Sequence, residues 1–195
     1  LDSNPLNIGP IGVTGSNSAN TIANKADLII AVGTRLQDFT TGSWTVFSMD
    51  SKFISINAAR HDATKHLSLP IVGDAKLALT TLSKACSGLK ASSEWMSFAQ
   101  DERKKWDAYV SDNISVVNNR PNSYAQAIGV VNTICDKRDR IVAAAGGLPA
   151  EVTANWRTLD IGTVDVEFGF SCMGYEIAGA WGAKIAQSQN EPEKL

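Results

Sequence analysis

A continuous run of apolar residues, Leu28 to Val32, lies near the start of the chain and ends at Gly33. Five residues are too few for a helix, and they do not alternate with polar residues. The run therefore predicts a β-strand that is buried on both faces in the middle of a parallel sheet. Before it, Ser16 or Asn17 can cap a helix that ends near Lys25. This order of turn, helix and strand favours an α/β layer fold.

Two more strands are expected after the first. Phe53 to Ile56 alternates between apolar and polar residues, and Pro70 to Gly73 leads into Asp74, which can cap a helix that ends near Cys86. That helix is expected to bury Leu77, Ala78, Leu82 and Ala85. The loop at residues 37–50 carries Trp44 and Phe47. This pair either lines a ligand crevice at the carboxyl ends of the strands or packs as a lid.

A long helix is predicted next, from its cap at Ser93 to about Ser111. One side of it is apolar and is formed by Trp95, Phe98 or Ala99, Trp106, Tyr109 and Val110. The opposite side carries both signs of charge, at Asp101, Glu102, Arg103, Lys104 and Lys105. Mixed signs are typical of a face in contact with solvent rather than of a nucleic-acid patch.

The remaining pattern predicts a second α/β segment. Ser123-x-x-Gln126 is a capping box, and Ile141 to Ala144 is a strand that runs into a Gly146-Gly147 turn. The capped helix is expected to bury Ala127, Ile128, Val131 and Ile134. With breaks in the pattern at residues 87–92 and 113–122, three parts are expected: a domain over residues 1–90, a linker with the long helix over 91–119, and the start of another domain over 120–195.

Composition excludes several classes of protein. With 195 residues, 44% of them hydrophobic, and a net charge of −2, the chain resembles an ordinary globular protein without the basic surplus that nucleic-acid binding needs. It has no apolar span long enough to cross a membrane and no visible signal peptide. Its cysteines, Cys86, Cys135 and Cys172, are odd in number and far apart, which argues against disulfides or a zinc site and favours a cytoplasmic protein.

Other candidate sites are weak. Gly9, Gly12 and Gly15 form a loop before a helix, which suits either an anion site or a tight turn against the sheet. Asn57 ends a strand where a dinucleotide-binding unit favours Asp or Glu. His61 and His66 do not share a helix face and have no Glu to complete a zinc motif, so solvated or packing roles are favoured for both histidines.

The last third of the chain carries the most informative pattern. Phe168 to Lys184 is a loop followed by a helix rich in Gly and Ala, which can approach a backbone or a ligand closely. This segment, with its Met173-Gly174-Tyr175 run and its Gly182-Ala183-Lys184 end, resembles the cofactor loop and helix of thiamine diphosphate enzymes of the acetohydroxyacid synthase type. Residues 9–12, 26–36 and 70–75 resemble the second half of the central domain of that superfamily.

Longer strings, at residues 9–20, 56–63 and 167–176, are similar to one branch of the superfamily. The enzymes of that branch hydrolyse a C–C bond of a cyclic 1,2-diketone in inositol catabolism. The resemblance implies a partial Rossmann-like central domain with a parallel sheet, followed by the start of a thiamine diphosphate-binding α/β domain. It also implies a small-molecule substrate, thiamine diphosphate and Mg²⁺ as cofactors, and a homodimer or homotetramer of the intact enzyme.

The resemblance assigns roles to particular residues. Met173 matches the bulky side chain under the thiazolium ring, and its N–H and the Ser171 carbonyl match the groups that bond the aminopyrimidine. Gly146 and Gly147 match the loop beside the diphosphate. The implied cofactor-binding residues are Gly146, Gly147, Ser171, Cys172, Met173 and Gly174. For Met173 taken alone, a role as a core gap-filler is the alternative.

The chain also departs from the family pattern. The family's metal motif, G-D-G with a later Asn pair, is expected beyond Leu195, and the activating Glu belongs to an N-terminal domain. Glu151, Glu167 and Glu176 do not match that Glu. No catalytic residue and no metal ligand is therefore expected in this chain, which is interpreted as an inactive internal fragment of an enzyme. A related acetolactate synthase-like ligase or decarboxylase and a non-catalytic nucleotide-binding module are the alternatives.

Overall fold

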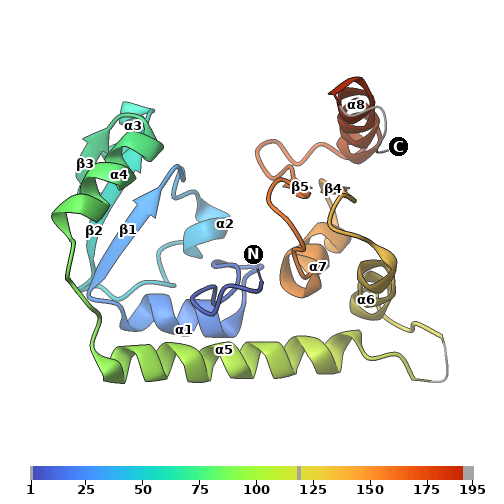
Figure 1. The fold of residues 1–195 in the computed structure, drawn as a ribbon, viewed down its shortest axis with the longest axis horizontal. Coiled ribbons are helices and arrows are strands. Elements are labelled where there is room, and N and C mark those ends of the chain that lie inside the picture. Colours follow the sequence, from blue (N-terminus) through green and yellow to red (C-terminus); the bar gives the residue numbers. More distant parts are fainter. Residues whose placement is uncertain (1, 118–119, 191–195) are drawn as a thin grey trace. The chain divides into compact units, whose positions relative to one another are not determined.

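The computed structural model describes residues 2–117 and 120–190 and has an α/β fold with two parallel sheets (Figure 1). The chain divides into a first unit, Ile8–Trp106, and a second unit made of Leu1–Asn7 and Asp107–Leu195. The division falls inside the long helix α5 (Ser93–Ile114). The predicted fold class is confirmed. The predicted domain limits stay predictions, and residues 118–119 of the expected linker lie outside the described residues.

The first unit contains a sheet in the order β1-β2-β3, with all strands parallel. Val32 is paired with Ile56, and Ile56 with Ile71. Its elements are α1 (Asn17–Lys25), β1 (Leu28–Val32), α2 (Asp38–Thr41), β2 (Lys52–Asn57), α3 (Arg60–Ala63), the 3₁₀ turn η1 (Lys65–Leu67), β3 (Leu69–Val72), α4 (Ala75–Ala85) and the first part of α5.

Local capping accounts for where these helices begin. The buried Ser16 side chain accepts a hydrogen bond from the Ala19 N–H at 2.9 Å, and Asp74 accepts one from the Leu77 N–H at 2.9 Å. Each bond satisfies a backbone donor that the first turn of a helix leaves unpaired. The predicted caps of α1 and α4 are therefore confirmed. For α5 the cap lies one residue earlier than predicted, because the Ser92 hydroxyl accepts from the Trp95 N–H.

The position predicted for the first strand is wrong, although its bounds are right. β1 lies at the edge of the sheet, and β2 is the central strand. Leu28, Ile30 and Val32 are 45%, 44% and 37% exposed, so one face of β1 is open in the described chain. Only the opposite face is packed, at Ala31. An apolar run shows that a strand is hydrophobic on both sides, but it cannot show whether this chain supplies the groups that cover them.

Aromatic rings fill the space between β2 and the α2–β2 loop. Phe47 is buried, and Trp44 contacts both Phe47 and Phe53, with ring centroids 5.5 and 5.3 Å apart. The His66 ring stacks on Trp44, with centroids 3.4 Å apart. These contacts favour the packing role for the aromatic pair and for His66.

The second unit has a two-stranded parallel sheet, β4-β5. Its elements are the end of α5, α6 (Tyr124–Ile134), β4 (Ile141–Ala143), α7 (Gly147–Asn155), β5 (Val164–Val166) and α8 (Tyr175–Asn190). Ser123 caps α6 as predicted. The Gln126 side chain accepts from the N–H of Asn122, one residue before the cap, and not from the N–H of Ser123 itself as a capping box requires. Residues near the start of the chain join this unit because Asp2 pairs with Arg157. The strand β5 and the helix α7 had no counterpart in the sequence prediction.

Three predicted helix faces are wrong in part. In α4 no residue is fully buried, and Leu77 and Ala85 are exposed. In α6 the buried residues are Ala125, Ile128 and Gly129, whereas Val131 and Ile134 are exposed. A Cβ on Gly129 would lie 2.6 Å from the Ile114 Cβ, so α5 approaches this side of α6 closely. Because α6 carries its own apolar residues on several sides, the position of the neighbouring helix decides which of them are buried.

The third departure concerns the charged side of α5. Glu102 is 6% exposed, whereas it was expected to face solvent. Its carboxylate accepts a hydrogen bond from the Lys105 ammonium at 2.5 Å. A buried carboxylate needs such a partner, and a helix places residues three apart on the same side.

Candidate functional site

The expected cofactor-binding residues fall into two loops that start at one edge of the second sheet. β4 and β5 are parallel, with Ala143 paired with Val166, so their carboxyl ends meet. The backbone N–H of Glu167 donates to the Ala143 carbonyl at 2.9 Å and extends the pairing by one bond. Ligands of open α/β sheets bind outside such carboxyl ends. The structure thus brings the Gly146–Gly147 turn and the Ser171–Gly174 loop to one edge.

The turn after β4 leaves open space beside its backbone. Gly146 has a φ of 105°, which strongly favours glycine, and it directly precedes α7. A Cβ built on Gly146 or Gly147 would meet no atom within 4 Å. The first N–H groups of a helix lack intrahelical partners and carry a partial positive charge. Open backbone at this helix start suits an anionic group such as a diphosphate.

The loop after β5 is held by carboxylates and is largely exposed. Oε1 and Oε2 of Glu167 accept from the N–H groups of Phe170 and Cys172, at 2.8 and 3.2 Å. Glu176 Oε2 accepts from the Gly174 N–H at 3.1 Å. The Met173 side chain is 82% exposed, so it is not a core gap-filler in this structure. The loop therefore presents an apolar side chain and backbone groups outward.

The sequence interpretation assigns no role to Glu167 or Glu176, beyond stating that neither matches the activating Glu, although both hold amides of this loop. The position of Glu167 gave a usable signal: an acidic residue directly after a strand, with a glycine two residues later, can turn back and accept from loop amides. The bond from the Glu167 N–H to the Ala143 carbonyl, at the shared edge, links the starts of the two loops.

The other candidates have structural roles. The Gly12 N–H donates to Asn20 Oδ1 at 2.9 Å, and a Cβ on Gly12 would lie 2.2 Å from the Phe39 carbonyl oxygen, which supports the tight-turn interpretation. Asn57 bonds the Thr34 carbonyl and the Ala59 N–H. Among the described residues, no group of three His, Cys, Asp or Glu side chains could hold a metal ion, and no helix is long and apolar enough to cross a membrane.

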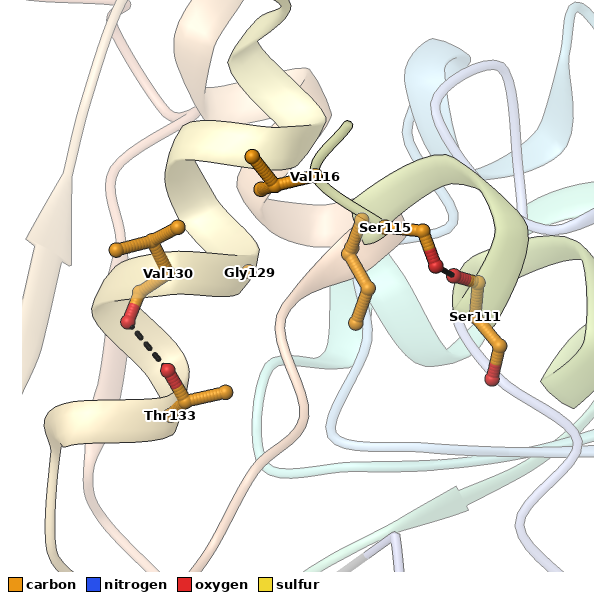
Figure 2. Close-up of a pocket in the computed structure, with 7 residues that line it drawn as sticks. Ser111, Ser115, Val116, Gly129, Val130 and Thr133 are labelled. Atoms are coloured by element: carbon orange, nitrogen blue, oxygen red, sulfur yellow. Dashed lines mark hydrogen bonds between the residues drawn. The ribbon is translucent and has the colours of Figure 1, made fainter. Parts of the chain in front are cut away.

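A pocket of about 370 Å³ lies elsewhere in the second unit, between the end of α5 and α6 (Figure 2). The Ser115 and Thr133 hydroxyls that line it donate to the carbonyls of Ser111 and Val130, each at 2.7 Å. Its lining residues are Ser111, Ile114, Ser115, Val116, Gly129, Val130 and Thr133. Because none of them is charged or titratable, the pocket offers no chemistry comparable to the β4–β5 edge.

Comparison with known proteins gives a consistent result. Residues 1–82 match the family described as "Thiamine pyrophosphate enzyme, central domain". The chain is 37% identical to 3D-(3,5/4)-trihydroxycyclohexane-1,2-dione hydrolase of Bacillus anthracis, over 97% of the chain and 33% of that protein. A Bacillus cereus hydrolase of the same name, numbered 1, shows the same identity and coverage, and a Bacillus thuringiensis relative is 36% identical.

The chain spans about a third of the length of these relatives. The similarity covers both units, whereas the central-domain match is confined to the first. Residues 1–82 belong to the central-domain family of thiamine pyrophosphate enzymes, and the chain as a whole is similar to one third of the hydrolases named above.

Proposed function

We propose that this chain supplies part of the thiamine diphosphate site of an enzyme that hydrolyses a C–C bond of trihydroxycyclohexane-1,2-dione. The observation that supports it most is the shared edge of β4 and β5, where the Gly146–Gly147 turn and the Ser171–Gly174 loop both begin. The names of the relatives, which are similar over almost the whole chain, support the substrate and the reaction class.

The described residues fit part of this cofactor. Open backbone at Gly146 and Gly147, before the start of α7, suits the diphosphate. The Ser171 carbonyl can accept from the aminopyrimidine, and the Met173 N–H can donate to it. The exposed Met173 side chain would lie under the thiazolium ring, with Cys172 and Gly174 on either side in the loop. When bound, the cofactor supplies a carbon nucleophile for the substrate carbonyl.

Other parts of the site are proposed to come from outside the described residues. Mg²⁺ would be held by the family's metal motif, since the described residues contain no acidic cluster for it. The activating Glu would come from another domain, and the enzyme would act as a homodimer or homotetramer in the cytoplasm. The chain alone is therefore proposed to be inactive. Neither nucleic acid nor a membrane is proposed as a partner.

The test compares ligands and substrates on protein that carries this chain at the length of its relatives. Thiamine diphosphate with Mg²⁺ is expected to raise the melting temperature, and the cyclic dione is expected to be opened. Turnover of pyruvate instead of the dione would favour the ligase or decarboxylase alternative. Stabilisation by a nucleotide, with none by thiamine diphosphate, would contradict the proposal in favour of a binding module.

A further inference from the structure

The loop that joins β5 to α8 (Figure 1) is restrained from its first residue. Glu167 directly follows β5, and its backbone N–H is bonded to the Ala143 carbonyl of the neighbouring strand. Its carboxylate turns into the loop and accepts from Phe170 N–H and Cys172 N–H. One side chain thus ties two loop amides to the sheet edge.

Packing contributes little to the conformation of this loop in the described chain. The Phe170 side chain is 90% exposed, and Met173 is exposed to a similar degree. Ser171, between the two bonded amides, has a φ of 51°, a left-handed conformation that is costly for a residue other than glycine. Such a conformation persists where its surroundings hold it in place. Two charge-assisted hydrogen bonds, from the Phe170 and Cys172 N–H groups to the Glu167 carboxylate, provide that restraint. A turn bond from the Tyr175 N–H to the Cys172 carbonyl adds to it.

The same carboxylates select which backbone groups face outward. The amide before Met173, that of Cys172, is bonded to Glu167, and the amide after it, that of Gly174, is bonded to Glu176. Among the described residues, the Met173 N–H has no hydrogen-bond partner. The one amide left available in residues 172–174 is therefore the amide that the proposed function assigns to the cofactor ring.

We propose that Glu167 is a positioning residue, whose carboxylate sets the backbone of residues 170–173 so that the Ser171 carbonyl and the Met173 N–H face the aminopyrimidine. The inference rests on the proposed function for the identity of the ring. The two bonds from loop amides to the Glu167 carboxylate, here called the clamp, are observed in this chain and do not depend on the proposed function. In this role Glu167 would act through the two loop amides that it binds, rather than by contacting the cofactor.

The first test is residue-resolved amide hydrogen exchange on the protein and its variants. Glu167→Ala is expected to raise exchange at Phe170 and Cys172 by about tenfold or more, because both amides lose a charged acceptor. Glu167→Gln keeps one acceptor oxygen and is expected to restore one of the two amides. Asp165→Asn removes the same charge from β5, where it faces Arg140 at 3.4 Å, and should leave both amides unchanged.

Two results of this test would overturn the clamp. One is unchanged exchange at both amides in Glu167→Ala and Glu167→Gln. The other is faster exchange throughout β4 and α8 in Glu167→Gln, which would mean that Glu167 serves general stability rather than the loop.

Calorimetric binding of thiamine diphosphate, on protein at the length of the relatives, separates the two proposals. Glu167→Gln is expected to bind about tenfold more weakly than wild type, and Asp165→Asn equally well. If the loop amides respond but Glu167→Gln binds like wild type, the positioning role is wrong and the proposed function stands. If the wild-type protein does not bind thiamine diphosphate, the proposed function is wrong. The aminopyrimidine is then also wrong as the group that the loop faces, whatever the exchange experiment shows.

Discussion

The two sheets end in carboxyl edges of different construction. In the first unit, side chains join one loop to the next: Asn57 Nδ2 donates to the Thr34 carbonyl at 2.9 Å, and the Lys65 ammonium donates to the Arg35 carbonyl at 2.8 Å. In the second unit, Glu167 bonds amides of its own loop, and the glycine turn after β4 has open space beside it.

In the first unit, side chains of this chain already bond the loop carbonyls at the edge. In the second unit, the edge has open space beside the glycine turn. Where side chains occupy the backbone groups of neighbouring loops, few donors and acceptors remain for a ligand. Where one carboxylate shapes a loop and apolar side chains stay exposed, backbone groups and surface remain for a ligand to use. We therefore expect substitutions at the first edge to change stability and those at the second to change binding.

The largest effect is expected in the core behind the first edge. Ile56, on the central strand β2, is completely buried. Ile56→Ala should lower the free energy of unfolding of the first unit by about 2–5 kcal/mol, through lost apolar contact and a residual cavity. Urea denaturation followed by circular dichroism measures this change, with Ile56→Val as the milder control. A loss below about 1 kcal/mol would contradict the assigned core.

A smaller loss is expected for the side chain that joins the loops of the first edge. Asn57→Ala removes the bond to the Thr34 carbonyl and the bond from the Ala59 N–H, and should cost about 1–3 kcal/mol in the free energy of unfolding. Asn57→Asp is the matched control, because it keeps the acceptor for Ala59 and loses the donor to Thr34. Equal stability of wild type and Asn57→Ala in the same denaturation experiment would show that the bridge between loops is unimportant.

A pH dependence is expected from the packing of His66 on Trp44. Partial desolvation of the ring, which stacks on Trp44, lowers the pKa of His66 below its ordinary value of 6.5, with a further contribution from the Lys65 charge. The unfolded chain then takes up the proton more readily, so stability is fully present above pH 6.5 and decreases as the pH falls below it. His66→Gln should reduce the difference in melting temperature between about pH 7.5 and about pH 5.5. An unchanged difference would contradict the role of His66.

The smallest effect on stability is expected at the open edge. Met173→Ala removes an exposed side chain and should change the free energy of unfolding by less than about 0.5 kcal/mol. Under the proposed function the same change should weaken thiamine diphosphate binding in the calorimetric assay, with Met173→Leu closer to wild type. A stability loss comparable to that of Ile56→Ala would remove the contrast between the two edges.

Features that depend on a few neighbouring residues were predictable from sequence. The bounds of β1 follow from an apolar run, and the caps at Ser16, Asp74 and Ser123 follow from side chains that reach backbone donors three residues away. The two cofactor loops were located through the family resemblance, and parallel pairing of β4 with β5 places them at one edge. Their roles in binding stay predictions.

The remaining features depend on contacts between residues far apart in the chain. The place of β1 at the sheet edge, the buried side of α6 and the burial of Glu102 were each predicted wrongly, because periodicity shows which residues are apolar and not which neighbour covers them. The role of Glu167 was missed for a different reason, because its carboxylate accepts from amides only three and five residues away and the local signal in the sequence was not used. Sequence by itself determined the approximate positions of β1 to β4, the caps at Ser16, Asp74 and Ser123, and the family resemblance. Only tertiary structure decided which strand is central and which faces are buried, because these features depend on which elements meet in space.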